Sequence, residues 1–382
     1  MSRIEKFQFV LLSIFVVLIM MDPTNKILHL KEPAFILLMI VTLLSRQYKV
    51  YRKTVKVMFI LLAFDIVALL SAGLFYNIDI SSGFGYTRTL LFFSVFLAIS
   101  SHSVNNILSL NYYVGLGLSC LILALYCIYI TGVIDPNLIY LAAMEFDYTI
   151  MIANRSFLGI EQTMFFYKTM PFVFFALIYS LRHGRFIGSC IIFASIWVGG
   201  SRTPILCGLS IICYYLWSKG YFRFMRLLLA ILAIVGMYML LIQLTSVENQ
   251  TEGDIIKIQT IEDFRQATSI IGHGPGVPFF SKARGEILTS TEMTYLEILY
   301  HYGYLLGFLL IFIFFKPVIE LVREKSFDIK DFGIAYLLYL INAGTNPLLI
   351  NSTGLYVFAT VLVLVSKTKD CLIITKHNIY KI

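Results

Sequence analysis

The chain has 382 residues, of which 59% are hydrophobic and only 14% are charged. Because a soluble domain carries about 25% charged residues, this composition excludes an ordinary soluble enzyme and predicts an integral membrane protein. The formal net charge of +8 does not indicate nucleic-acid binding, because the Lys and Arg residues lie in short segments between apolar blocks.

Apolar blocks of roughly the length needed to cross a bilayer recur along the chain. The first resembles a signal peptide, but Asp22 and Pro23 follow it without a small-residue cleavage site, so we expect an uncleaved span. We predict an all-α integral membrane protein of about 12 transmembrane helices, a single polytopic domain over residues 1–382. The predicted spans are 7–21, 28–45, 56–75, 88–101, 112–130, 164–181, 186–199, 203–218, 227–244, 294–315, 332–344 and 354–366.

The distribution of basic residues predicts the orientation of these spans. With the N-terminus inside, the predicted inner segments hold 20 of the 30 Lys and Arg residues, and the outer side holds the other 10. Short loops that are rich in Lys and Arg stay in the cytoplasm. We therefore expect both termini to be cytoplasmic.

Two predicted outer loops, 131–163 and 245–293, are much longer than the rest and contain many of the acidic residues. Because loops on a rigid scaffold often carry function, we expect recognition or chemistry there. The six cysteines lie in or beside apolar segments or in the tail, without metal-ligand spacing. The sequence thus predicts neither a disulfide framework nor a metal site.

The first candidate for chemistry is the segment Gly199–Pro204, between two predicted spans at the outer face. Arg202 beside hydrocarbon usually pairs with an anion or lines a polar cavity. Ser201 suits a helix cap and Pro204 suits a first helical turn, so free N–H groups and Arg202 together would form a phosphate site. The alternative is an arginine that merely extends to the interface at a tight turn.

The second candidate is Gly272-His273-Gly274-Pro275-Gly276, late in the second outer loop. Three glycines and a proline predict an irregular turn that a ligand can approach closely. His273 could act as a base or a hydrogen-bond donor, although a lone loop histidine is more often simply solvated.

Cations flank that turn at Arg265, Lys282 and Arg284, and the carboxylates of Glu286 and Glu292 follow. Such a set suits a lipid-linked phosphate ligand with a hydroxyl to be activated. An ordinary loop of mixed charge has the same composition. Further polar candidates are Asp65, Arg88, Arg155, Asn342, Asn346 and Asn351.

The order of these motifs resembles the O-antigen polymerase and ligase superfamily. The resemblance rests on Ser201-Arg202-Thr203 between two spans, then a long outer loop with Gly-His-Gly-Pro-Gly, then Tyr295-Leu296 at the start of a helix that contains Gly303. It covers the whole topology, with motifs in residues 199–307, and implies a helical architecture like that of GT-C glycosyltransferases.

One departure from the ligase pattern and one match to a polymerase pattern favour the polymerase branch. Ligases typically carry His-Asn-x-Tyr-Leu where this chain reads Glu292-Met293-Thr294-Tyr295-Leu296, so Glu292 replaces the proposed catalytic histidine. Arg265 and Gly276 fit an Arg-x10-Gly pattern of polymerases, but Arg155 has no glycine at that distance in the first loop.

The resemblance implies an enzyme of the bacterial inner membrane that transfers a growing glycan between undecaprenyl-pyrophosphate carriers on the periplasmic face, without metal or cofactor. It allows a polysaccharide chain-length regulator as a partner. Under this hypothesis Arg202 and Arg284 bind the pyrophosphate with help from Arg265, and Glu292 or His273 activates the acceptor hydroxyl. We expect further substrate contacts from Arg88, Arg155, Tyr295, Gly274 and Gly276.

Three other functions remain open. A flippase or transporter also suits about twelve spans, although internal repeats and short loops are typical of that group. An O-antigen ligase is the nearest enzymatic alternative. A structural scaffold is the third, but it does not require cations beside a glycine-rich turn.

Overall fold

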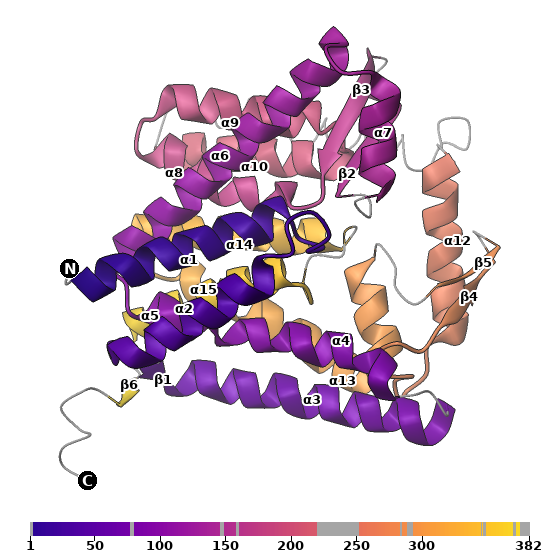
Figure 1. Ribbon diagram of the computed structural model, residues 1–382, viewed down its shortest axis with the longest axis horizontal. Coiled ribbons are helices and arrows are strands. Elements are labelled where there is room, and N and C mark those ends of the chain that lie inside the picture. Colours follow the sequence, from indigo (N-terminus) through magenta and orange to yellow (C-terminus); the bar gives the residue numbers. More distant parts are fainter. Residues whose placement is uncertain are drawn as a thin grey trace.

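A computed structural model describes residues 3–76, 80–145, 149–157, 160–219, 252–282, 285–288, 293–344, 346, 349–369 and 372–374 of the protein. Over these residues the chain is mostly helical (Figure 1). The α-helices are α1 (Arg3–Met21), α2 (Lys31–Ser45), α3 (Arg52–Tyr76), α4 (Ile80–Leu91), α5 (Phe96–Ser100), α6 (Val104–Thr131), α7 (Pro136–Glu145), α8 (Val173–Arg182), α9 (Phe186–Val198), α10 (Arg202–Ser218), α12 (Glu252–Ala267), α13 (Thr294–Val322), α14 (Phe327–Ala343) and α15 (Ser352–Thr368).

The described strands form three two-stranded antiparallel sheets. β1 (Val50–Tyr51) pairs with β6 (Leu372–Ile374), β2 (Ile150–Phe157) with β3 (Ile160–Tyr167), and β4 (Phe279–Ser281) with β5 (Glu286–Leu288). Two short 3₁₀ helices, η1 (Phe92–Val95) and η2 (Met170–Phe172), lead into α5 and α8.

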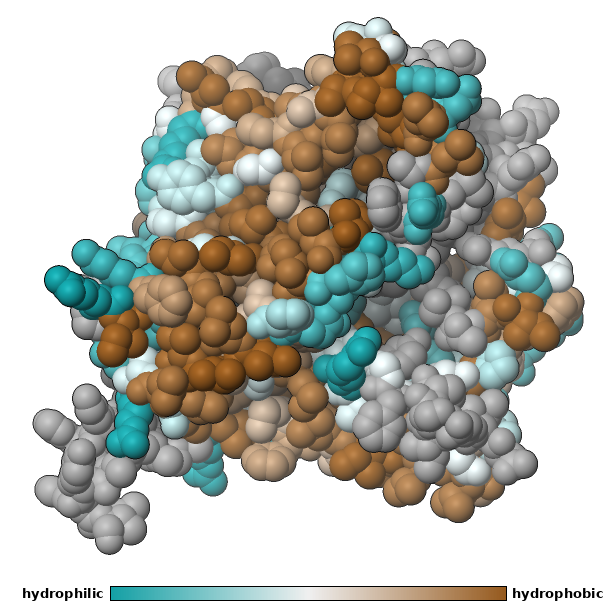
Figure 2. Space-filling model, viewed as in Figure 1, coloured by the Kyte–Doolittle hydropathy of each residue, from teal (hydrophilic) through white to brown (hydrophobic). Residues whose placement is uncertain are grey.

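The helices bury polar residues and expose apolar ones. Gln8 and Asp65 are fully buried, whereas Leu74 is 77% exposed and Phe312 is 57% exposed. Figure 2 shows broad hydrophobic areas over the helical part of one face. Since exposed apolar surface is unfavourable in water, this arrangement suits hydrocarbon as the solvent. The helices α1, α3, α6 and α13 are each long and apolar enough to cross a bilayer.

The predicted spans within the described residues each overlap a helix. The prediction was wrong at the start of 164–181, because residues up to Tyr167 belong to β3 and η2 begins only at Met170. A run of Met, Phe and Tyr suits a buried strand as well as a helix, and pairing with β2 selects the strand. The predicted span 227–244 lies outside the described residues.

Both long loops contain regular structure. The segment 131–163 holds α7 and most of the β2–β3 hairpin, and the segment 245–293 holds α12 and the β4–β5 hairpin. Figure 1 places these elements at the end of the molecule opposite the N-terminus. The β1–β6 pairing holds the chain after α15 against residues 50–51, on the side of the N-terminus.

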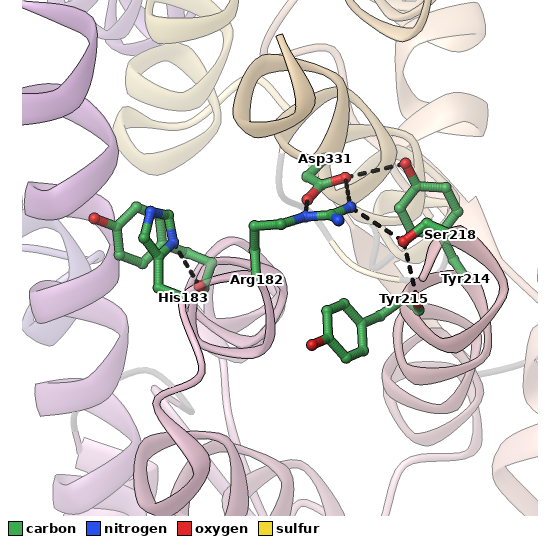
Figure 3. Close-up of polar contacts among 7 residues, drawn as sticks. Arg182, His183, Tyr214, Tyr215, Ser218 and Asp331 are labelled. Atoms are coloured by element: carbon green, nitrogen blue, oxygen red, sulfur yellow. Dashed lines mark hydrogen bonds and ion pairs between the residues drawn. The ribbon is translucent and has the colours of Figure 1, made fainter. Parts of the chain in front are cut away.

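An ion pair joins α8 to α14 (Figure 3). The Arg182 guanidinium donates to both oxygens of Asp331, from Nε at 2.5 Å and from Nη2 at 2.8 Å. Tyr214 of α10 donates to the same carboxylate at 3.0 Å. Near the other end of α10, Cys207 Sγ lies 3.7 Å from the carbonyl oxygen of Leu338. The helices α10 and α14 are therefore antiparallel.

Candidate functional site

Helix α13 is interrupted at Gly303, where the backbone leaves helical geometry (φ 74°, ψ 172°). The residues before Gly276 replace the helical hydrogen bonds that this break removes. The N–H of His273 donates to the carbonyl oxygen of Tyr300 at 3.0 Å, and the N–H of Gly274 donates to that of His301 at 2.9 Å. The N–H of Tyr304 donates to Ser269. Residues 269–278, the inserted loop, thus satisfy backbone groups that would otherwise be unpaired in a membrane-spanning segment.

Glycines make this close contact possible. A Cβ at Gly272 would lie 2.4 Å from the nitrogen of Gly303, and a Cβ at Gly303 would lie 2.4 Å from the nitrogen of Gly272. On the other side, a Cβ at Gly274 would lie 2.4 Å from the carbonyl oxygen of Ala68 in α3. Ser71 of α3 donates to the carbonyl oxygen of Gly272 at 2.7 Å. The inserted loop is therefore packed between α3 and α13.

The side chain of His273 lies between two aromatic rings. It stacks on Tyr300 with centroids 4.4 Å apart and planes at 7°, and its centroid is 4.6 Å from that of Tyr76. The Nδ1 atom of His273 is buried and has no hydrogen-bond partner among the described residues. Burial lowers the pKa of His273 below its ordinary value, against a smaller opposing effect of the backbone of Tyr300. The neutral imidazole is favoured, which is the form that accepts a proton.

Three further titratable groups lie in the two helices around the inserted loop. His301 Nδ1 is 2.8 Å from the carbonyl oxygen of Gly274, so Nδ1 carries the proton. Its Nε2 is 3.6 Å from a carboxylate oxygen of Glu297, one turn earlier. On α3, the buried Asp65 accepts hydrogen bonds from Thr87 at 2.5 Å and from Tyr302 at 3.4 Å. Histidine, carboxylate and hydroxyl groups are thus gathered where α13 is broken.

Arg202 is the first residue of α10 and is half-buried. Because α10 and α14 are antiparallel, the start of α10 lies at the same end of the bundle as the C-terminus of α14. The start of α13 reaches that end too: Thr294 donates to the carbonyl oxygen of Asn346 and Tyr295 to that of Leu340, both at 2.5 Å. Arg202 and the first turn of α13 therefore share one end of the molecule.

The other predicted cations lie in different surroundings. Arg265 is on α12, 72% exposed, and pairs with Glu262 at 2.9 Å. Arg88 is an exposed residue of α4 beside Thr87. Arg155 is in β2, paired in register with Gln162, and its side chain is not described. Arg284 and Glu292 lie outside the described residues.

The remaining predicted substrate contacts have structural roles in this fold. The Tyr295 hydroxyl is engaged by Leu340, as above, and its ring contacts that of Phe315. Gly274 and Gly276 both have positive φ, 90° and 84°, as the turn requires. Sequence reasoning missed His301 and Glu297. The signal was present, because a Glu and a His four residues apart share a helix face, next to a glycine in an apolar helix.

No group of three or more His, Cys, Asp or Glu side chains in the described part of the chain could hold a metal ion. No family model matches the chain, and no curated protein or solved structure is similar enough to count as a match. The fold and the exposed apolar helices define the class of protein, a helical membrane protein. The polar groups around the inserted loop define its candidate site.

Proposed function

We propose that the chain is an O-antigen polymerase, which transfers a growing glycan from undecaprenyl pyrophosphate to the non-reducing end of another lipid-linked repeat unit. The observation that best supports this function is the inserted loop, which holds His273 against the broken α13. Arg202, at the start of α10, lies at the same end of the bundle as the first turn of α13. The motif resemblance supplies the substrate class. The proposed topology has twelve spans, with both termini in the cytoplasm of a bacterial inner membrane and this site facing the periplasm.

The reaction forms one glycosidic bond and breaks one bond to phosphate. The acceptor hydroxyl oxygen attacks the anomeric carbon of the donor glycan, and undecaprenyl pyrophosphate leaves with the electron pair. In this proposal Arg202 and Arg284 stabilise the charge on the leaving pyrophosphate. Glu292 or His273 takes the proton of the attacking hydroxyl. Arg265, exposed and paired with Glu262, has at most an accessory role.

The length of surface polysaccharide tests the role of Arg202. In cells that lack the chromosomal copy, Arg202→Ala is expected to leave mainly single repeat units, because loss of one preorganised donor costs about 10²–10³ in rate. Arg202→Lys should retain part of the activity. Arg323→Ala, which alters an exposed residue at the other end of α13, is the matched control and should give long chains. Long chains from Arg202→Ala would disprove the phosphate role, and loss of all attached glycan, single units included, would indicate a ligase.

The pH profile of the purified enzyme distinguishes the two candidate bases. Because burial lowers the pKa of His273 from 6.5, a rate that depends on neutral His273 persists at pH 6.5. The rate falls only as the pH drops through the lowered pKa, and this fall is the acid limb of the pH profile. His273→Gln should abolish this acid limb if His273 is the base. If Glu292 is the base, Glu292→Gln should abolish it and His273→Gln should leave it in place.

A further inference from the structure

A groove of about 470 Å³ lies between α1 and α6, away from the inserted loop. It lies within the size range of small-molecule sites, about 300–1,000 Å³. Its α6 side extends from Asn106 to Leu118, a rise of roughly 18 Å along the helix. This is long enough to hold a hydrocarbon chain.

The lining of the groove changes from polar to apolar along α6, from Asn106 and Ser109 to Val114 and Leu118. On α1 the lining is apolar apart from Ser13. Both helices begin on the side of the N-terminus (Figure 1). The polar part of the groove therefore faces that side, and the apolar part extends toward the middle of the bundle.

A cation lies beside Tyr113, near the middle of the α6 side of the groove. The Arg185 guanidinium carbon is 4.4 Å from the ring centroid of Tyr112, 5.4 Å from that of Tyr113 and 5.5 Å from that of Tyr179. Tyr113 also lines the groove. Gly188 leaves the space for Tyr112, since a Cβ there would lie 2.7 Å from the Tyr112 hydroxyl. Aromatic rings thus hold Arg185 in position.

Arg185 differs from its neighbour Arg182 in its partners. Arg182 is bound by the Asp331 carboxylate, whereas within the described residues no carboxylate forms an ion pair with Arg185. The hydroxyl of the exposed residue Tyr113 and the guanidinium of Arg185 suit a phosphate group. The apolar part of the groove beyond them suits an acyl chain.

We propose that the groove between α1 and α6 binds one anionic phospholipid, with its phosphate at Arg185 and Tyr113 and one acyl chain between the two helices. This lipid belongs to the leaflet on the side of the termini, so its site is distinct from the inserted loop. The proposal does not depend on the glycosyltransferase activity.

Native mass spectrometry of the full-length protein, released from detergent with added phosphatidylglycerol or phosphatidylcholine, tests this site. The unaltered protein should retain phosphatidylglycerol preferentially. Arg185→Gln should lower that preference roughly tenfold, the loss expected for a charged hydrogen bond. Lys219→Gln is the matched control, because Lys219 is also a cation over a tyrosine ring, 5.7 Å from Tyr215, but Tyr215 does not line the groove. It should change nothing.

A second variant blocks the part of the groove that would hold the acyl chain, rather than the part that would hold the phosphate. A Cβ at Gly117 would have no heavy atom within 4 Å, so Gly117→Phe enters the groove without a collision at the backbone. It should abolish retention of both lipids at an unchanged melting temperature. Unaltered phosphatidylglycerol retention in Arg185→Gln and Gly117→Phe would overturn the proposal. Displacement of the lipid by undecaprenyl phosphate, or a dimer that Gly117→Phe dissociates, would assign the groove to another occupant and overturn it equally.

Discussion

The carboxylate of Asp331 is a shared acceptor for side chains from two other helices, Arg182 of α8 and Tyr214 of α10 (Figure 3). Its side chain is only 3% exposed and that of Arg182 is 13% exposed. Asp331→Leu should destabilise the protein by about 3–5 kcal/mol, because a largely buried guanidinium loses its counter-charge. Denaturation in mixed micelles measures this cost.

The double variant Arg182→Met with Asp331→Leu should recover most of that stability, because a pair of packed apolar side chains leaves no unpaired charge. A double variant as unstable as Asp331→Leu would show that the lost counter-charge is not the cause. The sequence alone indicated no partner for Arg182. Its partner is 149 residues away, a separation that no local pattern encodes.

At the scale of elements, the break in α13 depends on the contact between Gly272 and Gly303. Gly303→Ala should destabilise the fold by about 3 kcal/mol or more, because alanine is strained at φ 74° and its Cβ would lie 2.3 Å from the carbonyl oxygen of Ile270. Gly85→Ala is the control. A Cβ at Gly85 in α4 would meet nothing within 4 Å, so this change should be neutral or stabilising by up to about 1 kcal/mol.

Thermal unfolding in detergent and protease sensitivity of the inserted loop measure both glycine variants. A Gly303→Ala protein as stable as Gly85→Ala, with its loop still protected, would disprove the structural role assigned to this contact.

The helices could be predicted because the length of each apolar block by itself indicates a helix across the membrane. The break in α13 could not, since a single glycine in an apolar run is tolerated in a helix. The break is caused by the inserted loop, about 30 residues earlier in the chain, together with α3. The irregular turn at residues 272–276 was predicted correctly, since Gly274 and Gly276 have positive φ. The sequence of this turn did not indicate that the rings of Tyr76 and Tyr300 lie on either side of His273. Such contacts arise only from tertiary packing.

At the scale of the whole molecule, the proposed topology assigns opposite sides to His183 and Ile287, both exposed. In a cysteine-free background, Ile287→Cys should react with an impermeant maleimide added to cells whose outer membrane alone is permeable. His183→Cys should react only after the inner membrane is opened. Equal labelling before that step, or the reverse pattern, would reject the proposed orientation.

The insertion of residues 269–278 has a consequence for how the protein is assembled. A broken helix with unpaired backbone groups costs several kcal/mol for each group in hydrocarbon, so α13 alone would enter the bilayer as a continuous helix. The break becomes favourable only when the loop supplies its partners, and the loop is in turn held by Ser71, 201 residues before Gly272. The three segments therefore stabilise this arrangement only together, and a chain in which one of them is not yet in place has no candidate site.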